Sequence, residues 1–318
     1  MPRLPVFHRE GFAMEHCRLC PRKCGAPRGS VTGSGFCGCG TTPVISRAAP
    51  HFWEEPVISG TRGSGTIFFS GCTLGCVFCQ NAAISTELRG RLVTPTELAD
   101  IMRRLEAEGV HNISFVTGTQ YVPAILEALA LYRPSLPLVW NSGGYETEET
   151  VNLLGNVIDI WLPDYKFALS EPAKRYAHAP DYPETALRAI ALMCEWNARR
   201  GGPLTMDGVM KRGVIVRHLV LPGQVRHSVA ALRKLSAHLP HGTPVSLMSQ
   251  YIPSGEIAPF PELQRRLTAR EYQRVLRTAE ELGLEGFMQD LNAASEEYVP
   301  DFDLTPVVPS TEPSTENK

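Results

Sequence analysis

The 318-residue sequence lacks the features that mark several large classes of protein. No apolar run approaches the ~18 residues that a membrane-spanning helix needs. Lys and Arg number 31 against 33 Asp and Glu, and the net charge of −2 predicts no general attraction to nucleic acid or anionic membranes. The first residues do not have the basic-then-apolar arrangement of a signal peptide, which predicts a cytoplasmic location.

Familiar catalytic motifs are missing as well. None of the nine histidines occurs in an H-x-x-x-H or H-E-x-x-H spacing, and there is no G-x-x-x-x-G-K-[ST] loop. The nine cysteines are far fewer than a disulfide scaffold would contain. Eight of them lie between Cys17 and Cys79, and only Cys194 stands apart, in a stretch expected to be helical and buried. Thiols clustered in a reducing compartment indicate metal ligands or redox groups.

From residue 66 onward, short apolar runs alternate with amphipathic stretches. Continuous β-branched and aromatic runs are typical of strands buried on both faces of a parallel sheet. Strands are expected at Thr66–Ser70, Asn112–Val116, Pro137–Asn141, Ile158–Leu162, Val214–Leu221 and Val245–Gln250. Capping boxes at Thr94 and Thr268 predict the starts of two helices. Six strand–helix units predict an α/β fold, a partial (β/α)6 TIM-like barrel, with an open doubly wound sheet as the competitor.

The chain divides into three parts by composition. Residues 1–65 form an N-terminal extension whose stretch from residue 17 is rich in Cys, Gly, Pro and Arg, with almost no periodicity. Such a segment has no core of its own and needs a metal or the main domain to hold it. Residues 66–303 form the barrel core. Residues 304–318 are rich in Pro, Ser, Thr and Glu and are predicted to be a disordered tail.

Three cysteines come immediately after the first predicted strand in the sequence. Cys72, Cys76 and Cys79 form a C-x-x-x-C-x-x-C motif at the catalytic end of a parallel barrel. Three thiolates can bind three irons of a 4Fe–4S cubane and leave the fourth iron open to an external ligand, whereas clusters that only transfer electrons normally use four cysteines. A buried thiol group or a zinc site is the alternative.

This triplet, in this position, resembles the radical S-adenosylmethionine (radical SAM) superfamily. The segments HFWEEPVISGTRGSGTIFFSGCTLGCVFCQN, VWNSGGYETEET, IDIWLPDYKFA and VIVRHLVLPG are similar to the pyruvate formate-lyase activating enzyme group, and to its relatives with a Cys-rich extension. The resemblance implies that the open iron binds SAM. An electron from the cluster then cleaves SAM, and a 5′-deoxyadenosyl radical takes hydrogen from a substrate. Members of the characterised group place a radical on a glycine of a partner protein.

The family's SAM-binding residues carry over in part. Asp164 and Lys166 match an Asp-x-Lys motif, and Arg217 matches a cation near the SAM carboxylate. Gly118 is the one match to a Gly-Gly-acidic segment that contacts the SAM amino group, and Thr119 replaces the acid. Gln250 and Tyr251 stand where the characterised group has a histidine.

Polar residues recur at the predicted carboxyl ends of the strands, where they would converge on one mouth. They are Cys72, Gly118, Asn141, Asp164, Arg217 and Gln250. Each also has an ordinary alternative, such as a turn cap for Asp164 or a surface ion pair for Arg217. Trp53, Glu54 and Glu55 match the family pattern without an evident mechanism.

The N-terminal cysteines suggest a second metal centre. Cys17, Cys20 and Cys24 form a C-x-x-C-x-x-x-C motif, and Cys37 or Cys39 would supply the fourth ligand. Four soft thiolates suit zinc or a fully ligated Fe–S cluster. A structural zinc knuckle, or cysteines that stay reduced and empty, are the alternatives.

These observations predict a radical SAM enzyme that acts on a protein or peptide, of the glycyl-radical activating type. Radical chemistry on a small molecule or RNA is the second hypothesis, and a non-catalytic Fe–S or zinc electron carrier or scaffold is the third. The expected cofactors are a 4Fe–4S cluster and SAM. A low-potential donor such as flavodoxin or ferredoxin is the expected source of electrons.

Overall fold

The computed structural model describes residues 15–291, 300, 302–304 and 307. Most of the predicted disordered tail therefore lies outside the described residues. Among the described helices, none is long and apolar enough to cross a membrane.

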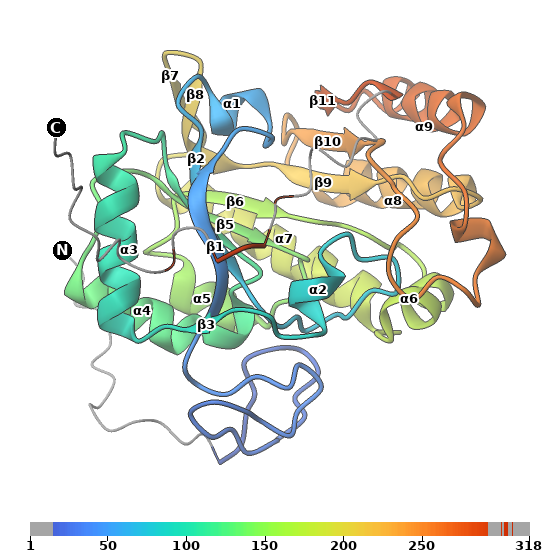
Figure 1. The fold of residues 1–318 in the computed structure, drawn as a ribbon. Coiled ribbons are helices and arrows are strands. Elements are labelled where there is room, and N and C mark those ends of the chain that lie inside the picture. The colour runs from blue at the N-terminus through green and yellow to red at the C-terminus, as the bar shows by residue number, and fades with distance from the viewer. Residues whose placement is uncertain (1–14, 292–299, 301, 305–306, 308–318) are drawn as a thin grey trace, which may run out of the picture.

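The fold is a mixed α/β structure built on a mostly parallel sheet (Figure 1). The strands are β1 (Val44–His51), β2 (Ser64–Phe69), β3 (Arg91–Leu92), β4 (Ile113–Val116), β5 (Leu138–Ser142), β6 (Ile160–Pro163), β7 (Leu204–Met206), β8 (Val209–Val214), β9 (Val216–Leu219), β10 (Val245–Met248) and β11 (Gly286–Met288). The helices are α1 (Pro56–Ser59), α2 (Ala82–Ser85), α3 (Pro95–Ala107), α4 (Val122–Leu131), α5 (Glu148–Leu154), α6 (Ser170–Ala177), α7 (Tyr182–Arg199), α8 (Val225–His238) and α9 (Ala269–Glu281). Two 3₁₀ turns cover Thr119–Tyr121 and Pro261–Leu263.

The six predicted parallel strands are present and pair in sequence order. β2, β4, β5 and β6 are consecutive parallel neighbours, and β9 pairs with β10 in parallel. A parallel bridge between Asp164 and Arg217 joins β6 to β9. Because the order of these six strands never reverses, they have no switch point of the kind that defines a doubly wound sheet. The partial-barrel prediction is confirmed.

The helices begin where the sequence predicts. In α3 and α9 the capping-box hydrogen bonds of Thr94 with Glu97 and of Thr268 with Glu271 are both present. Gly109, just after α3, has the positive φ of 79° that a helix-ending glycine supplies. The helices α3, α4, α5, α8 and α9 each lead directly to the next strand, so the carboxyl ends of the parallel strands meet on one side.

One strand lies inside the range that the sequence assigns to the extension. β1 pairs antiparallel with β2 along most of its length and places Ile45 and Ala48 in the core. Arg47 and Pro50 interrupt its apolar pattern, which is why the sequence does not reveal it. The Cys-rich segment before β1 has no helix and forms the loop at the bottom of Figure 1.

Candidate functional site

The three cysteines of the central motif lie on the loop between β2 and α2 and line a cavity of about 780 Å³. Gly71 and Gly75 have positive φ values of 83° and 59°, which let this cluster loop turn twice within five residues. The Cys72 Sγ accepts a hydrogen bond from the Leu74 backbone N–H at 3.4 Å. No other cysteine of the described residues lines the cavity.

The donor set fits a cubane better than a single ion. In the described part of the chain, no three His, Cys, Asp or Glu side chains are grouped so as to hold one metal ion. In a 4Fe–4S cluster each thiolate binds its own iron, so the thiols need not meet at one point. Burial raises the pKa values of the Cys72 and Cys76 thiols, so we expect cluster binding to release protons from this loop.

An aromatic group supports the cluster loop from behind. The Phe78 ring meets the rings of Phe167, Tyr176 and Tyr251 edge to face, with centroids 6.2 to 6.4 Å apart. The Val77 backbone N–H also donates to the Tyr176 carbonyl at 2.9 Å. These contacts hold the loop in place, because a buried ring cannot move without disturbing the packing of the core.

Gly255 is expected to be essential for this loop. Its φ is +80°, and a Cβ there would lie 2.4 Å from the Val77 carbonyl oxygen. Gly255→Ala would therefore push the loop between Cys76 and Cys79, and we expect iron loss to a chelator to rise by about 10-fold or more, as for other changes in the shell around metal ligands. Gly242→Ala is the matched control, since its φ is +78° but no atom lies within 4 Å. Equal iron retention in both variants would contradict this role.

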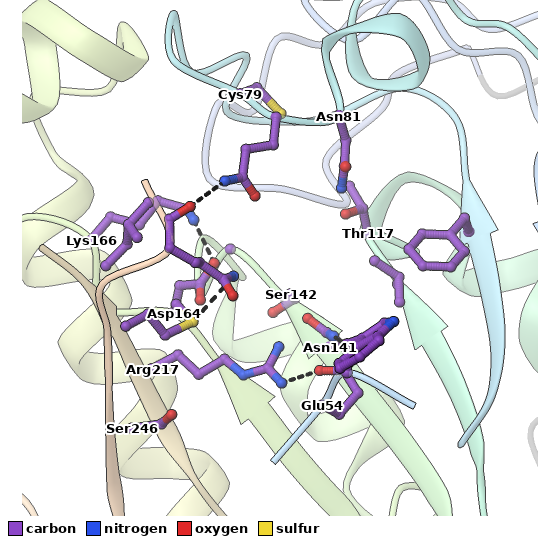
Figure 2. A pocket seen from close by; sticks show the side chains of 18 of the residues that line it. Glu54, Cys79, Asn81, Thr117, Asn141, Ser142, Asp164, Lys166, Arg217 and Ser246 are labelled. Carbon is purple, nitrogen blue, oxygen red and sulfur yellow. Dashed lines mark hydrogen bonds and ion pairs between the residues drawn. The ribbon is translucent and has the colours of Figure 1, made fainter. Parts of the chain in front are cut away.

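Asp164 and Lys166 face the cavity together from the segment after β6 (Figure 2). The Lys166 Nζ donates to the Asp164 carboxylate. Burial opposes the charge on Lys166, but Asp164 and the nearby thiol of Cys76 outweigh it and hold the pKa of Lys166 above its ordinary value. The Tyr182 hydroxyl fixes this turn, because it donates to the Asp164 carbonyl at 2.8 Å and accepts from the Lys166 N–H at 2.9 Å.

Arg217 lies near the start of β9, opposite Asp164, and its partners come from the segment before α1. Its Nε and Nη2 donate to both carboxylate oxygens of Glu55, at 2.9 and 2.6 Å, and Nη2 also contacts Glu54. Burial opposes ionisation of Glu55, yet Arg217 keeps the pKa of Glu55 below its usual range. Glu54 is held further by the Asn141 amide at 3.1 Å.

This group explains residues that the sequence matched without a mechanism. Two carboxylates against one guanidinium leave one net negative charge at the wall of the cavity. The charge complements a cationic ligand such as a sulfonium. Among the described residues, the hydrogen bonds of Arg217 are made by Nε and Nη2, and Nη1 has no partner.

Of residues 117–119, which correspond to the family's Gly-Gly-acidic segment, only Thr117 lines the cavity. Thr117 lines the cavity with a φ of +59°, which is rare for a β-branched residue. Gly118 is not among the lining residues, and a Cβ there would lie 2.9 Å from Ile125. Thr119 is buried and its hydroxyl donates to Glu146 at 3.1 Å, where burial raises the Glu146 pKa. Thr119, which replaces the family's acidic residue, is therefore part of the core and does not face the cavity.

The segment after β10 closes the far side of the cavity. The Gln80 side-chain amide donates to the Gln250 carbonyl at 2.6 Å, and Gln289 donates to the Gln250 side-chain oxygen at 3.0 Å. Gln250 therefore lines the cavity, while Tyr251 is buried and donates to the Leu263 carbonyl at 2.6 Å. Of the six polar residues expected at the mouth, all but Gly118 line the cavity.

The remaining cysteines of the described residues do not line the cavity. Cys194 is buried in α7, as predicted. Cys17, Cys20 and Cys39 are buried, Cys37 is half-buried and Cys24 is exposed. Since no three of these thiols surround one ion in the described structure, the second metal centre predicted from the sequence is not shown.

Comparison with known proteins identifies the class. The family model of the radical SAM superfamily matches residues 66–235, more than half of the chain. The uncharacterized protein MJ0674 of Methanocaldococcus jannaschii is 30% identical over 280 residues, which cover 85% of this chain and 76% of that protein. The chain belongs to the radical SAM superfamily. Membership implies an enzyme of radical chemistry that uses a 4Fe–4S cluster and SAM.

Solved structures give more distant similarities. Streptococcus suis SuiB bound to S-adenosylmethionine has 10% identity and a TM-score of 0.47 over 74% of this chain and 48% of SuiB. The chain thus spans about half the length of SuiB. A domain of pyruvate-formate lyase-activating enzyme from Bacteroides vulgatus has 13% identity and a TM-score of 0.36, over 62% of this chain and 91% of that domain.

Proposed function

We propose that this protein cleaves SAM reductively at a 4Fe–4S cluster held by Cys72, Cys76 and Cys79. The observation that carries the proposal is that these three are the cysteines lining the cavity in the described residues. A three-cysteine set leaves room for an external ligand, as catalytic metal sites keep an open position. When bound, the cluster supplies the electron that splits SAM into methionine and a 5′-deoxyadenosyl radical, which abstracts hydrogen from substrate.

The chain's own residues then bind and orient SAM. Lys166, kept charged by Asp164, is the cation for the SAM carboxylate, and Arg217 Nη1, which has no partner among the described residues, is a further hydrogen-bond donor to it (Figure 2). The surplus negative charge of Glu54 and Glu55 attracts the sulfonium. Gly118 stays part of the proposal through its backbone only, because Thr119 cannot offer a carboxylate and is turned toward Glu146.

We propose that the substrate is a protein or peptide, with a glycine Cα–H as the site of abstraction. Three exposed apolar side chains at the edge of the cavity support a polypeptide partner: Phe52, Trp53 and Met288, which are 53%, 51% and 47% exposed. A low-potential donor of the flavodoxin or ferredoxin class would supply the electron. A second metal centre at the N-terminal cysteines also belongs to the proposal, and the cytoplasmic location stays a prediction.

The test is SAM cleavage by protein reconstituted with iron and sulfide under anaerobic conditions and reduced with dithionite. The proposal predicts 5′-deoxyadenosine formation, even if slow without substrate. Deuterium transfer from a labelled peptide into 5′-deoxyadenosine would support the polypeptide substrate, and transfer from a small molecule or RNA instead would contradict it. A protein that binds iron but never cleaves SAM would be an electron carrier, and one that binds zinc alone a scaffold.

A further inference from the structure

The Cys-rich segment is fastened to the cluster loop by one side chain, Arg22. Its Nε donates to the Thr73 carbonyl at 2.5 Å and its Nη2 to the Leu74 carbonyl at 3.2 Å. The same guanidinium donates to the carbonyls of Ala177 and His178, both at 3.0 Å, at the end of α6. Arg22 lies between Cys20 and Cys24 in sequence, while Thr73 and Leu74 lie between Cys72 and Cys76. The two cysteine motifs are therefore in direct contact.

The ring of Phe36 strengthens this contact. The Arg22 guanidinium carbon lies 3.4 Å from the centre of the Phe36 ring, a cation–π arrangement. The ring in turn packs over Gly75, where a Cβ would come within 3.1 Å of it. Phe36 immediately precedes Cys37, so this packing fixes Cys37 as well as the cluster loop.

Four thiols gather within the segment. Backbone hydrogen bonds from Cys17 N–H to the Ala26 carbonyl and from Gly25 N–H to the Cys17 carbonyl fold residues 17–26 into a closed loop. Cys20 is buried inside this loop, and its carbonyl accepts from the Lys23 N–H at 3.0 Å. The Cys24 Sγ would lie 3.0 Å from a Cβ at Gly35, on the turn that carries Cys37.

Cys39 lies next to Cys37 but packs beneath the cluster loop. Its Sγ donates to the Cys37 carbonyl at 3.2 Å and contacts the Ser70 carbonyl at 3.8 Å, at the end of β2. A Cβ at Gly71 would lie 2.1 Å from this sulfur, so the thiol fills the space under the cluster loop. Cys39 has an assigned place in packing, and Cys37 is the fourth member of the group.

The surroundings suit an anionic centre made of thiolates. Arg28 is only 3% exposed, and its Nη1 lies 3.8 Å from the Cys17 Sγ in a hydrogen bond. Its other nitrogens hold the Cys39 carbonyl at 3.0 Å and the Gln120 carbonyl at 2.7 Å, so the charge is fixed in place. Buried arginine beside grouped thiols offsets the negative charge that metal binding creates.

We infer that Cys17, Cys20, Cys24 and Cys37 ligate a second, fully protein-bound 4Fe–4S cluster, seated against the first cluster loop by Arg22. Four thiolates complete all four corners, so this centre would not bind SAM. Four thiolates also suit zinc, and the metal count below distinguishes the two. The inference deepens the second metal centre of the proposed function by naming its ligands and its kind.

The test counts iron and sulfide in anaerobically reconstituted full-length protein. We expect about eight irons per chain in the wild type, and about four in each of two triple variants, Cys17→Ala/Cys20→Ala/Cys24→Ala and Cys72→Ala/Cys76→Ala/Cys79→Ala. The reduced Cys72→Ala/Cys76→Ala/Cys79→Ala protein should give an electron paramagnetic signal that SAM does not change. Cys39→Ala and Cys194→Ala serve as controls that keep about eight irons.

Three results would overturn the inference. They are about four irons in the wild type with no change in Cys17→Ala/Cys20→Ala/Cys24→Ala, one zinc per chain in Cys72→Ala/Cys76→Ala/Cys79→Ala, or iron loss in Cys39→Ala but not in Cys37→Ala. Circular dichroism of each variant identifies any that fails to fold, and Cys37→Ala in the wild-type background then supplies an independent count. Failure of the proposed function gives a different pattern, in which both clusters assemble and SAM is never cleaved.

Discussion

Cys72→Ala, Cys76→Ala and Cys79→Ala proteins are each expected to form no 5′-deoxyadenosine, while Cys194→Ala forms it at the wild-type rate. Each of the three sulfurs holds a separate iron in the proposed cluster, so losing any one removes a corner that no other cysteine lining the cavity can replace. Cys194 is buried in α7 and does not line the cavity. The measurement is 5′-deoxyadenosine formed under dithionite, with iron content determined on the same samples.

The N-terminal cysteines give this experiment its sharper control. Cys17→Ala should retain at least part of the cleavage activity, because Cys17 belongs to the other thiol group and contacts Arg28. Complete loss of cleavage in Cys17→Ala, equal to that in the three cluster-loop variants, would contradict the division of the cysteines into two sites.

Arg217→Ala should be among the most destabilising single changes around the cavity. The substitution leaves Glu54 and Glu55 buried without their cation, and breaking a buried pair in this way costs about 3–5 kcal/mol. The free energy of unfolding from urea titration measures the loss. Arg188→Ala is the matched control, since Arg188 and its partner Glu148 are 69% and 57% exposed and such pairs contribute no more than about 1 kcal/mol.

The pH dependence of that loss has a defined sign. In the wild type Arg217 lowers the Glu55 pKa below 4.5, so the stability from this pair is present at neutral pH and is lost as pH falls through the lowered value. Without Arg217, burial alone would raise the folded-state pKa above 4.5, and the variant would lose stability as pH rises. We therefore expect a larger deficit at pH 7 than at pH 5.

A charge-free replacement separates the charge from the packing. Glu54→Gln/Glu55→Gln/Arg217→Met removes all three charges at once and should recover most of the stability that Arg217→Ala loses. If the triple variant were as unstable as Arg217→Ala, or if the deficit did not change between pH 5 and pH 7, the loss would come from packing and not from uncompensated carboxylates.

The sequence predicts the barrel well because the strands and helices of the barrel are marked by local sequence patterns. The six apolar runs and the capping boxes at Thr94 and Thr268 are short-range patterns, and each corresponds to an element of the fold. The Cys72–Cys79 motif is equally local, and its place after β2 follows from the strand before it. The sequence does not predict β1, because Arg47 and Pro50 break its apolar run. Its pairing with β2 is a tertiary contact, which no local pattern in the sequence reports.

Long-range pairings explain what the sequence could not supply at the site. Glu55 meets Arg217 across 162 positions, and no spacing rule connects them. In the same way, the hydrogen bond from Thr119 to Glu146 in the core depends on where the fold places the segment after β5, which the sequence does not predict. Arg22 stands next to two cysteines, which suggests charge compensation, yet its four carbonyl partners lie more than 50 positions away.

The central claim is that one iron at the Cys72–Cys79 loop stays open for SAM. The most direct measurement is the electron paramagnetic resonance spectrum of the reduced protein with and without SAM, taken on Cys17→Ala/Cys20→Ala/Cys24→Ala protein so that only this centre contributes. The account predicts a 4Fe–4S signal whose g values shift when SAM is added. An unchanged spectrum at saturating SAM, or no iron–sulfur signal at all, would contradict it.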